Sequence, residues 1–256
     1  MKPRVIVVAG GLATRMKTIS EKVPKCLLRL DKKPLIQHQI EFFKRKGYTN
    51  FIFCIAYLGD KIKKYFKDGN SFGVNIHYSE EPEDLLGTAG TVKLIQSMLD
   101  NTFIVYYGDI LTNEDFDKVL QFHKQKNSDF TIVVRLLRRG YISSSLIIMD
   151  ENYRTKVFIE KPSKEDFEKY KDEKRYINNG IYIIEPKILP EIPQGIKYDF
   201  AKQLIPKLLK MNMNVYCYVS SSLFEEIGTM EKYGKFKEKL KENKIENEWK
   251  QSSFFR

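Results

Sequence analysis

The sequence predicts an α/β fold in which a Rossmann-like, doubly wound sheet carries a small β-rich insertion. Up to about residue 136, short apolar runs alternate with amphipathic helical patterns. This order is typical of a mostly parallel sheet that is covered by helices. After that point, apolar runs follow one another with shorter connections, which favours antiparallel strands and makes the expected sheet mixed. With 256 residues, 42% of them hydrophobic, the chain can bury one substantial core.

The first half of the chain supplies the alternation. Five runs rich in branched and aromatic residues are expected to be strands: Val5–Ala9, Phe51–Ala56, Val74–Tyr78, Phe103–Tyr107 and Phe130–Leu136. Four stretches between them have apolar residues at helical spacing and begin near residues 35, 62, 91 and 116. Gly47 is expected to end the first helix, because glycine readily adopts the left-handed conformation that follows many helices.

The second half is expected to add four strands and two helices. The strands are Leu146–Met149, Lys156–Ile159, Ile181–Ile184 and Val215–Val219. One helix covers Asp199–Leu209, with the Asp199 carboxylate near its positive end, and the other runs from Met230 to about Lys244. No hexapeptide repeat is present, so no C-terminal β-helix is expected, and residues 241–256 are expected to form a helical end and a loose tail.

Composition limits the classes of function. The net charge is +11, from 44 Lys and Arg against 33 Asp and Glu, but many cations alternate with acidic residues. This pattern favours a solvated surface over a nucleic-acid partner. No apolar run approaches the roughly 18 residues of a membrane span, so no membrane partner is expected. The three cysteines, Cys26, Cys54 and Cys217, lack metal-ligand spacing and indicate thiols in a reducing cytoplasm. The three histidines, His38, His77 and His123, share no motif and are not expected to be catalytic.

The most informative stretch follows the first expected strand, which ends abruptly at Gly10 and Gly11. Glycines allow backbone N–H groups to approach a phosphate closely, and the nearby cations Arg15 and Lys25 can neutralise it. Neither the G-x-x-x-x-G-K-[ST] phosphate loop nor the G-x-G-x-x-G dinucleotide pattern is present here. The stretch therefore predicts a binding site for a substrate with several phosphates.

This stretch resembles the signature of sugar-1-phosphate nucleotidyltransferases, G-G-x-G-T-R-[LM] followed by P-K. These enzymes join a nucleoside triphosphate to a sugar 1-phosphate and release pyrophosphate. The match has one departure, since Ala13 stands where the family usually has glycine. The resemblance implies that Arg15 binds the β- and γ-phosphates and Lys25 the α-phosphate. It also implies nucleotide contacts from four residues at the loop: Ala9, Gly10, Gly11 and Leu12.

A second glycine motif, Leu86-Gly87-Thr88-Ala89-Gly90, precedes an expected helix. By itself it is equally consistent with a tight turn and a helix cap. It resembles the base-binding loop of the same family, with Gly87 and Thr88 against the base. The L-G-T-A-G form is typical of members that use GTP, such as mannose- and heptose-1-phosphate guanylyltransferases.

Asp109 directly follows the apolar run Phe103–Tyr107 and Gly108. Ligands of open α/β sheets bind at the carboxyl ends of strands, and Mg²⁺ takes one or two carboxylates plus phosphates. The resemblance makes Asp109 a Mg²⁺ ligand and Gly108 a nucleotide contact. The family's second metal ligand is the aspartate of [WF]-x-D-[IVT]-G-T-P-x-x-Y, and Glu226 occupies that position here. The longer side chain of glutamate places the metal geometry in question.

The sugar side of the resemblance rests on two shorter motifs. Glu160-Lys161-Pro162 matches the family's E-K-P, whose glutamate holds a sugar hydroxyl and whose lysine holds the sugar phosphate. Asn178 and Gly180 match N-x-G-x-Y near the sugar. Serines at 143–145 replace a glycine of many relatives, which favours an altered sugar pocket.

Taken together, the resemblance implies Mg²⁺-dependent nucleotidyl transfer, with GTP favoured, in a domain over residues 1–240. Its nucleotide-binding part would be about 1–135 and its sugar-binding part about 136–228. Four alternatives stay open: UTP, dTTP or CTP as donor, a non-sugar phosphate acceptor, a non-catalytic nucleotide-sensing homologue, and a nucleic-acid-binding protein suggested by charge alone. The resemblance also allows a homodimer.

Overall fold

The computed structural model describes residues 2–10, 23–81, 86–137 and 145–241, and the chain divides into two compact units. The first unit comprises Met1–Leu85, Tyr106–Glu114 and Ser222–Arg256. The second comprises Leu86–Val105 and Asp115–Ser221. The sequence-based division near residue 135 refers to ligand binding, and this grouping of contacts does not test it.

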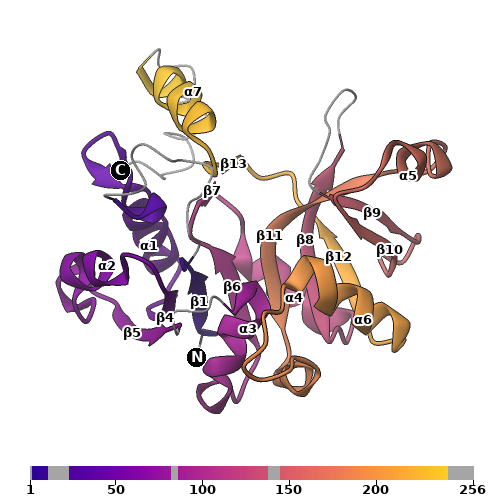
Figure 1. Ribbon diagram of the computed structural model, residues 1–256, viewed down its shortest axis with the longest axis horizontal. Coiled ribbons are helices and arrows are strands. Elements are labelled where there is room, and N and C mark those ends of the chain that lie inside the picture. The colour runs from indigo at the N-terminus through magenta and orange to yellow at the C-terminus, as the bar shows by residue number, and fades with distance from the viewer. Residues whose placement is uncertain (1, 11–22, 82–85, 138–144, 242–256) are drawn as a thin grey trace. The chain divides into compact units, whose positions relative to one another are not determined.

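A parallel sheet forms the core of the first unit. Its strands are β1 (Val5–Val8), β4 (Asn50–Ile55) and β5 (Asn75–Glu80), with β4 between the other two. Two helices accompany it, α1 (Leu35–Arg45) and α2 (Gly59–Phe66), in the indigo and violet part of the ribbon (Figure 1).

Aromatic side chains pack both helices against β4. The ring of Phe43 in α1 meets Phe51 edge-to-face with 5.9 Å between centroids, and Phe66 in α2 meets Phe53 at 5.8 Å. These four rings are fully buried, and edge-to-face geometry is the favourable one for aromatic pairs. Gly47 follows α1 with φ of +82°, so the expected helix end is confirmed.

Two short strand pairs, two 3₁₀ turns and one helix also belong to the first unit. Strand β7 (Ile110–Thr112) pairs antiparallel with β13 (Phe224–Glu226), and β2 (Arg29–Leu30) pairs with β3 (Lys33–Pro34). Short 3₁₀ turns cover Lys25–Leu27 and Asn70–Phe72, and α7 (Met230–Lys241) follows β13. Neither strand pair is predicted from the sequence, because two or three residues are too few to show a strand period. Expected helix residues beyond 241, and the tail, lie outside the described residues.

The second unit holds the β-rich part. Its strands are β8 (Phe130–Leu136), β9 (Ser145–Met149), β10 (Thr155–Glu160), β11 (Tyr176–Ile184) and β12 (Val215–Val219). Strand β11 runs antiparallel to β8 and β9, β10 runs antiparallel to β9, and β12 runs parallel to β8. Strand β6 (Phe103–Tyr107) begins in the second unit and ends in the first. The expected α/β fold with a mixed sheet and antiparallel strands after residue 136 is confirmed.

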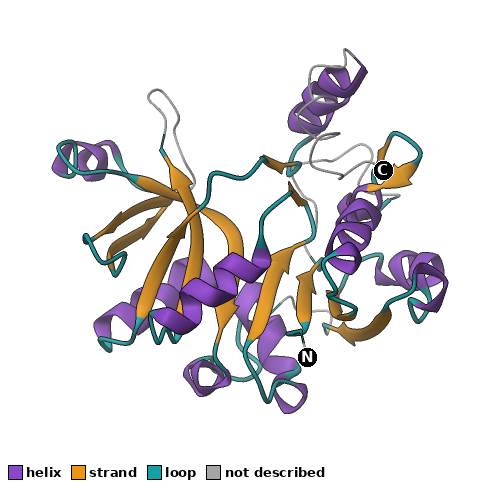
Figure 2. Ribbon diagram, turned by 180° about the vertical axis from the view of Figure 1, so that it is seen from behind, coloured by secondary structure: helices purple, strands orange, loops and turns teal. Residues whose placement is uncertain are grey.

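Four helices belong to the second unit: α3 (Gly87–Leu94), α4 (Phe116–Gln125), α5 (Lys164–Lys169) and α6 (Ile205–Lys210). Short 3₁₀ turns cover Gln96–Met98 and Pro186–Glu191. Helices α4 and α6 contact strands of this unit, and Figure 2 shows these strands in orange flanked by purple helices. A π-helical turn, Phe200–Leu204, leads into α6, where Pro206 has no N–H to extend a regular ladder.

All three cysteines lie among the described residues, where they are buried and form no disulfide. Burial raises the pKa of the Cys26 and Cys217 thiols to about 12, so both stay protonated near neutral pH. No helix in the described part of the chain is long and apolar enough to cross a membrane.

Candidate functional site

The first part of the site lies at the carboxyl end of β1. The backbone N–H of Ala9 donates to Cys54 at 2.9 Å, and the N–H of Gly108 donates to Val8 at 3.0 Å. Ala9 and Gly108 are therefore neighbours, since a Cβ atom at Gly108 would lie 3.5 Å from that of Ala9, and Gly10 follows Ala9; their contacts with a nucleotide stay predictions. A Cβ atom at Gly10 would lie 2.5 Å from a carboxylate oxygen of Glu81, so a side chain there requires Glu81 to move. Gly11, Leu12 and Arg15 lie outside the described residues.

Two distant carboxylates meet in the same unit. Strand β13 pairs with β7 so that Glu226 lies opposite Ile110, and the N–H of Ile227 donates to the Asp109 carbonyl at 2.7 Å. A Cβ atom at Gly228 would lie 2.7 Å from Glu226 Oε1 and 3.5 Å from Asp109 Oδ2. Both carboxylates therefore face Gly228, and the missing side chain leaves space for their oxygens.

Two lysines lie beside this carboxylate pair. Lys25 Nζ donates to the Gly228 carbonyl at 3.0 Å, and Lys232 Nζ lies 2.6 Å from Glu226 Oε2. Burial raises the pKa of Asp109, and the nearby Glu226 charge raises it further, whereas the charges of Lys25 and Lys232 lower it. We refer to these five residues, Lys25, Asp109, Glu226, Gly228 and Lys232, as the carboxylate–lysine cluster.

The backbone around Lys25 is fixed by a short turn. The N–H of Leu27 donates to the Pro24 carbonyl at 2.9 Å, and the N–H of Leu28 donates to that of Lys25 at 3.0 Å. Cys26 in the same turn is buried, which anchors the turn in the core. Lys25 itself is partly buried, so its ammonium is held at the cluster rather than extended into solvent.

The carboxylate pair fits a magnesium ion. Mg²⁺ is usually held by one or two protein carboxylates, while phosphates and water supply its remaining ligands. The described residues contain no group of three or more His, Cys, Asp or Glu that could form an all-protein metal cage. Both carboxylates face the space at Gly228, and burial together with the Glu226 charge raises the pKa of Asp109, so a cation bound there would favour the ionised carboxylate.

The second glycine motif lies in the second unit and is braced by the segment before α6. The N–H groups of Ala89 and Gly90 both donate to the Tyr198 carbonyl at 2.9 Å. Asp199 Oδ1 accepts the N–H of Thr88 at 3.1 Å, and Gly87 has φ of +73°. A Cβ atom at Gly87 would lie 2.9 Å from the Tyr198 carbonyl oxygen, so this position requires glycine for both conformation and space.

The expected capping role of Asp199 takes a different form. Asp199 precedes its own helical segment, but its side chain makes no capping hydrogen bond there. The carboxylate instead caps α3, whose own N-cap residue, Leu86, has no side-chain acceptor. The first N–H groups of α3, which have no partner within the helix, thus donate to Tyr198 and Asp199, more than a hundred residues away in the sequence.

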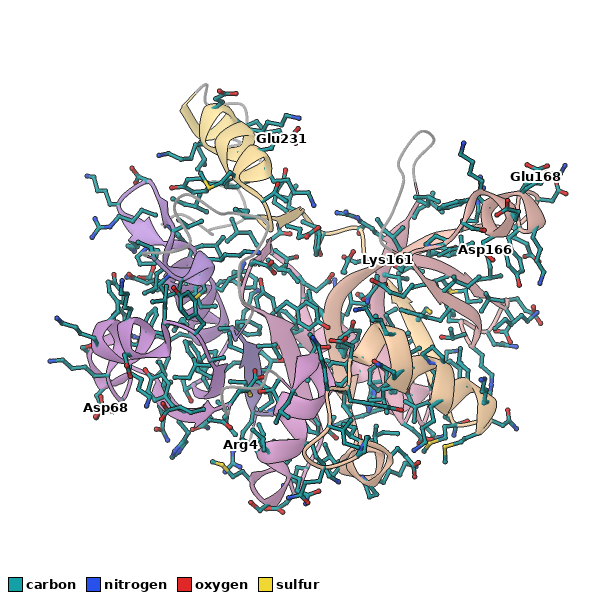
Figure 3. All side chains as sticks on the ribbon, in the orientation of Figure 1. Arg4, Asp68, Lys161, Asp166, Glu168 and Glu231 are labelled. Carbon is teal, nitrogen blue, oxygen red and sulfur yellow. The ribbon has the colours of Figure 1, made fainter. Side chains whose placement is uncertain are left out.

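The expected sugar-binding residues gather on three strands of the second unit. Glu160 ends β10 opposite Ser145 of β9, and the hydroxyl of Ser145 accepts the N–H of Asn178 in β11 at 2.9 Å. Lys161 follows Glu160 and is exposed; Figure 3 labels it at the end of β10. Its φ of +56° is an uncommon conformation for a non-glycine residue, and such strain is found at ligand-binding positions.

The Asn178 amide is engaged within the strand. Its Nδ2 donates to the Tyr182 hydroxyl at 2.7 Å, and its Oδ1 accepts the N–H of Gly180 at 2.9 Å. Gly180 has φ of +69° and lies where the pairing of β11 with β8 shifts register. Asn178 therefore shapes this bulge. Pairing with β8 continues on both sides of it, so the strand begins at Tyr176 rather than at the expected Ile181.

Sequence reasoning missed four residues at these places. Lys232 falls at a variable position of the motif around Glu226, and the sequence predicts no role for Gly228. It predicts Asp199 at the start of its own helix and shows Ser145 only as one of three consecutive serines. Only the folded chain reveals these roles, since each depends on a contact with a residue at least six positions away in the sequence.

Comparison with known proteins gives a consistent picture. The family described as "Nucleotidyl transferase" matches residues 4–243. The chain is 31% identical over 242 residues to a UTP–glucose-1-phosphate uridylyltransferase of Synechocystis, covering 90% of this chain and 61% of that protein. It is 29% identical over 238 residues to a probable mannose-1-phosphate guanylyltransferase 1 of Oryza sativa, covering 90% and 62%. The chain thus spans about three fifths of these relatives' length.

Among solved structures, HddC from Yersinia pseudotuberculosis superposes with a TM-score of 0.77 at 25% identity, covering 93% of this chain and 100% of that one. The same protein has also been solved in complex with GMP-PN, with the same TM-score and coverage.

Proposed function

We propose that this chain, which belongs to the nucleotidyl transferase family, transfers a nucleotidyl group from a nucleoside triphosphate to a sugar 1-phosphate. The observation that carries the proposal is the carboxylate–lysine cluster, which joins Lys25, Asp109 and Glu226 from three separate parts of the sequence. Two carboxylates with room for a cation and a neighbouring ammonium are what phosphoryl transfer requires.

In the proposed reaction, a phosphate oxygen of the sugar 1-phosphate attacks the α-phosphorus of the nucleotide in line. A new P–O bond forms, the bond to the β-phosphate breaks, and the electron pair leaves with pyrophosphate. Negative charge grows on the non-bridging and leaving oxygens, so fixed positive groups are the main source of rate acceleration. No covalent intermediate with the protein is needed.

The residues of the cluster have separate roles. Lys25, held partly buried beside Gly228, neutralises the α-phosphate oxygens. Asp109 and Glu226 would hold Mg²⁺, which would offset the phosphate charge. Arg15 binds the β- and γ-phosphates, a role that rests on the sequence motif alone. Ala9, Gly10, Gly11, Leu12 and Gly108 line the nucleotide.

GTP is the proposed donor. The Leu86–Gly90 motif has the form typical of guanylyltransferases, and its backbone is firmly braced by Tyr198 and Asp199. The relatives include both guanylyl- and uridylyltransferases, and HddC binds the guanine nucleotide GMP-PN. We assign Gly87 and Thr88 to base binding, and UTP, dTTP and CTP are the competing donors in the test below.

On the acceptor side, Glu160 orients a sugar hydroxyl and Lys161 holds the sugar phosphate. Their position at the end of β10 and the left-handed backbone of Lys161 support these roles. Asn178 and Gly180 act by shaping the bulge of β11, because the Asn178 amide is bonded to Tyr182 and Gly180 of the same strand. The buried thiols fit a cytoplasmic location, where nucleoside triphosphates are also found.

The experiment that tests the proposal measures pyrophosphate release with Mg²⁺, crossing GTP, UTP, dTTP and CTP with a panel of sugar 1-phosphates and other small phosphomonoesters. Release that depends on one donor, one acceptor and the metal supports the proposal. Release with another donor keeps the reaction and replaces GTP.

The alternative is a non-catalytic nucleotide-sensing homologue. Two observations favour it: Ala13 in the loop and an ion-paired Glu226 in place of aspartate. Tight GTP binding by calorimetry, together with no pyrophosphate release from any acceptor, would establish this alternative.

A further inference from the structure

Lys232 forms an ion pair with Glu226, the residue at the second expected metal-ligand position. Its Nζ lies 2.6 Å from Glu226 Oε2, and the two side chains are 41% and 39% exposed. The backbone of Lys232 is fixed at the start of α7, where its N–H donates to the Thr229 hydroxyl at 3.2 Å in an N-cap arrangement. The backbone of Glu226 is fixed by its pairing with Ile110 between β13 and β7, so both partners of the ion pair have ordered backbones.

The other groups around Glu226 explain why it attracts an internal cation. Glu226 Oε1 and Asp109 Oδ2 both face Gly228, and the charge of Glu226 raises the pKa of Asp109. Two carboxylates so placed repel each other, and a nearby cation relieves the repulsion. Lys25, the other cation of the cluster, donates to the Gly228 carbonyl rather than to either carboxylate. Lys232 is thus the cation in contact with Glu226 among the described residues.

A divalent ion and Lys232 need the same carboxylate. Mg²⁺ binds through carboxylate oxygens, and a positive ammonium at 2.6 Å from one of them both competes for it and repels the incoming ion. We propose that Lys232 is an internal counter-ion of Glu226 that a divalent cation must displace. This inference rests on the metal role given to Glu226 in the proposed function.

The ion pair between Lys232 and Glu226 affects the order in which metal and nucleotide bind. In the chain without nucleotide, the ion must break the ion pair between Lys232 and Glu226, and the ammonium then needs another acceptor. The phosphates of a nucleoside triphosphate supply such an acceptor, so Lys232 exchanges Glu226 for a phosphate oxygen when metal and nucleotide arrive together. The structure thereby favours binding of the metal–nucleotide complex over binding of the metal alone.

The test measures Mn²⁺ affinity by electron paramagnetic resonance, without nucleotide, in wild type, Lys232→Met and Lys232→Gln. Removing a half-exposed ion-pair partner is expected to tighten Mn²⁺ binding by about two- to tenfold in both variants. Lys235→Met is the matched control, because Lys235 lies in the same helix, pairs with exposed Glu231 (labelled in Figure 3) and touches no member of the cluster. Its Mn²⁺ affinity is expected to equal that of wild type.

Unchanged or weaker Mn²⁺ binding in both Lys232 variants overturns the inference, and so does an equal gain in Lys235→Met. Adding nucleotide is expected to tighten Mn²⁺ binding more in wild type than in Lys232→Met. Pyrophosphate release distinguishes failure of this inference from failure of the proposed function. If wild type releases pyrophosphate but the Lys232 variants bind Mn²⁺ as wild type does, the proposed function stands and this inference is rejected. A Lys232 effect without release from any acceptor keeps the inference and rejects the proposed transfer.

Discussion

Replacing Asp199 with alanine tests how the glycine motif at Gly87 and Thr88 is held. The Asp199 carboxylate accepts the N–H of Thr88 at 3.1 Å and lies 3.4 Å from its hydroxyl. Both side chains are partly buried, so water replaces the lost acceptor only in part. The bonds from Ala89 and Gly90 to the Tyr198 carbonyl use backbone atoms and remain in the variant.

The expected loss can be bounded from these contacts. Loss of an N-cap acceptor costs about 0.5–2 kcal/mol, and leaving a buried donor without a partner costs about 1–3 kcal/mol. Because the Thr88 N–H is partly buried, we expect Asp199→Ala to lower the free energy of unfolding by about 2 kcal/mol. Asp199→Asn keeps an oxygen acceptor and loses only charge, so about 1 kcal/mol or less is expected.

Urea unfolding measures the free-energy difference, and hydrogen–deuterium exchange over residues 86–95 locates it. We expect faster exchange in that segment in Asp199→Ala, with smaller change in Asp199→Asn. If the segment binds the base, the KM for the nucleotide rises while kcat changes little. Equal stability of wild type and Asp199→Ala, or equal losses in the two variants, would refute the capping argument.

Three other predictions concern the cluster and one buried histidine. Lys25→Ala is expected to remain folded while its turnover falls about a hundredfold, because removing one preorganised charge costs about 3 kcal/mol of transition-state stabilisation. Near-normal turnover would contradict the role of Lys25. Asp109→Asn is expected to abolish Mg²⁺-dependent transfer without lowering the free energy of unfolding at pH 7. Burial and the Glu226 charge raise the pKa of Asp109, so its ionised form is less favourable in the folded chain than in the unfolded chain. Ionised Asp109 therefore lowers the free energy of unfolding of wild type, and urea unfolding should show this loss growing as the pH rises above about 3.8. Burial lowers the pKa of His123 below its usual 6.5, so the unfolded chain binds more protons; wild type should lose stability as the pH falls below about 6.5, and His123→Gln should lose less.

The sequence predicted several strands well because each is a short run rich in apolar, branched and aromatic residues. Phe103–Tyr107, Phe130–Leu136 and Val215–Val219 have the predicted bounds in the structure, where their central residues are buried. Strands β6 and β8 are buried on both faces over most of their length, which leaves little freedom in composition and makes the apolar pattern easy to recognise. The strand Tyr176–Ile184 was predicted too short, since Asn178 to Gly180 interrupt the apolar pattern at a bulge.

The site was predictable in its residue types and less so in its contacts. The sequence motifs indicated Lys25, Asp109 and Glu226, and the structure brings these three together. The ion pair between Glu226 and Lys232 was not predictable, because lysine is common on exposed helix faces and its partner depends on the angle at which α7 leaves β13. Arg15, Gly11 and Leu12 lie outside the described residues, so their roles stay predictions.

The most direct test of the account is to locate the divalent ion. A crystal of the protein grown with Mn²⁺ and a non-hydrolysable nucleoside triphosphate gives an anomalous signal at the metal. The account predicts one strong peak about 2.1 Å from carboxylate oxygens of both Asp109 and Glu226, with Lys232 turned away from Glu226. A peak bound to phosphates but to neither carboxylate would contradict the central claim that this cluster is the metal centre for nucleotidyl transfer.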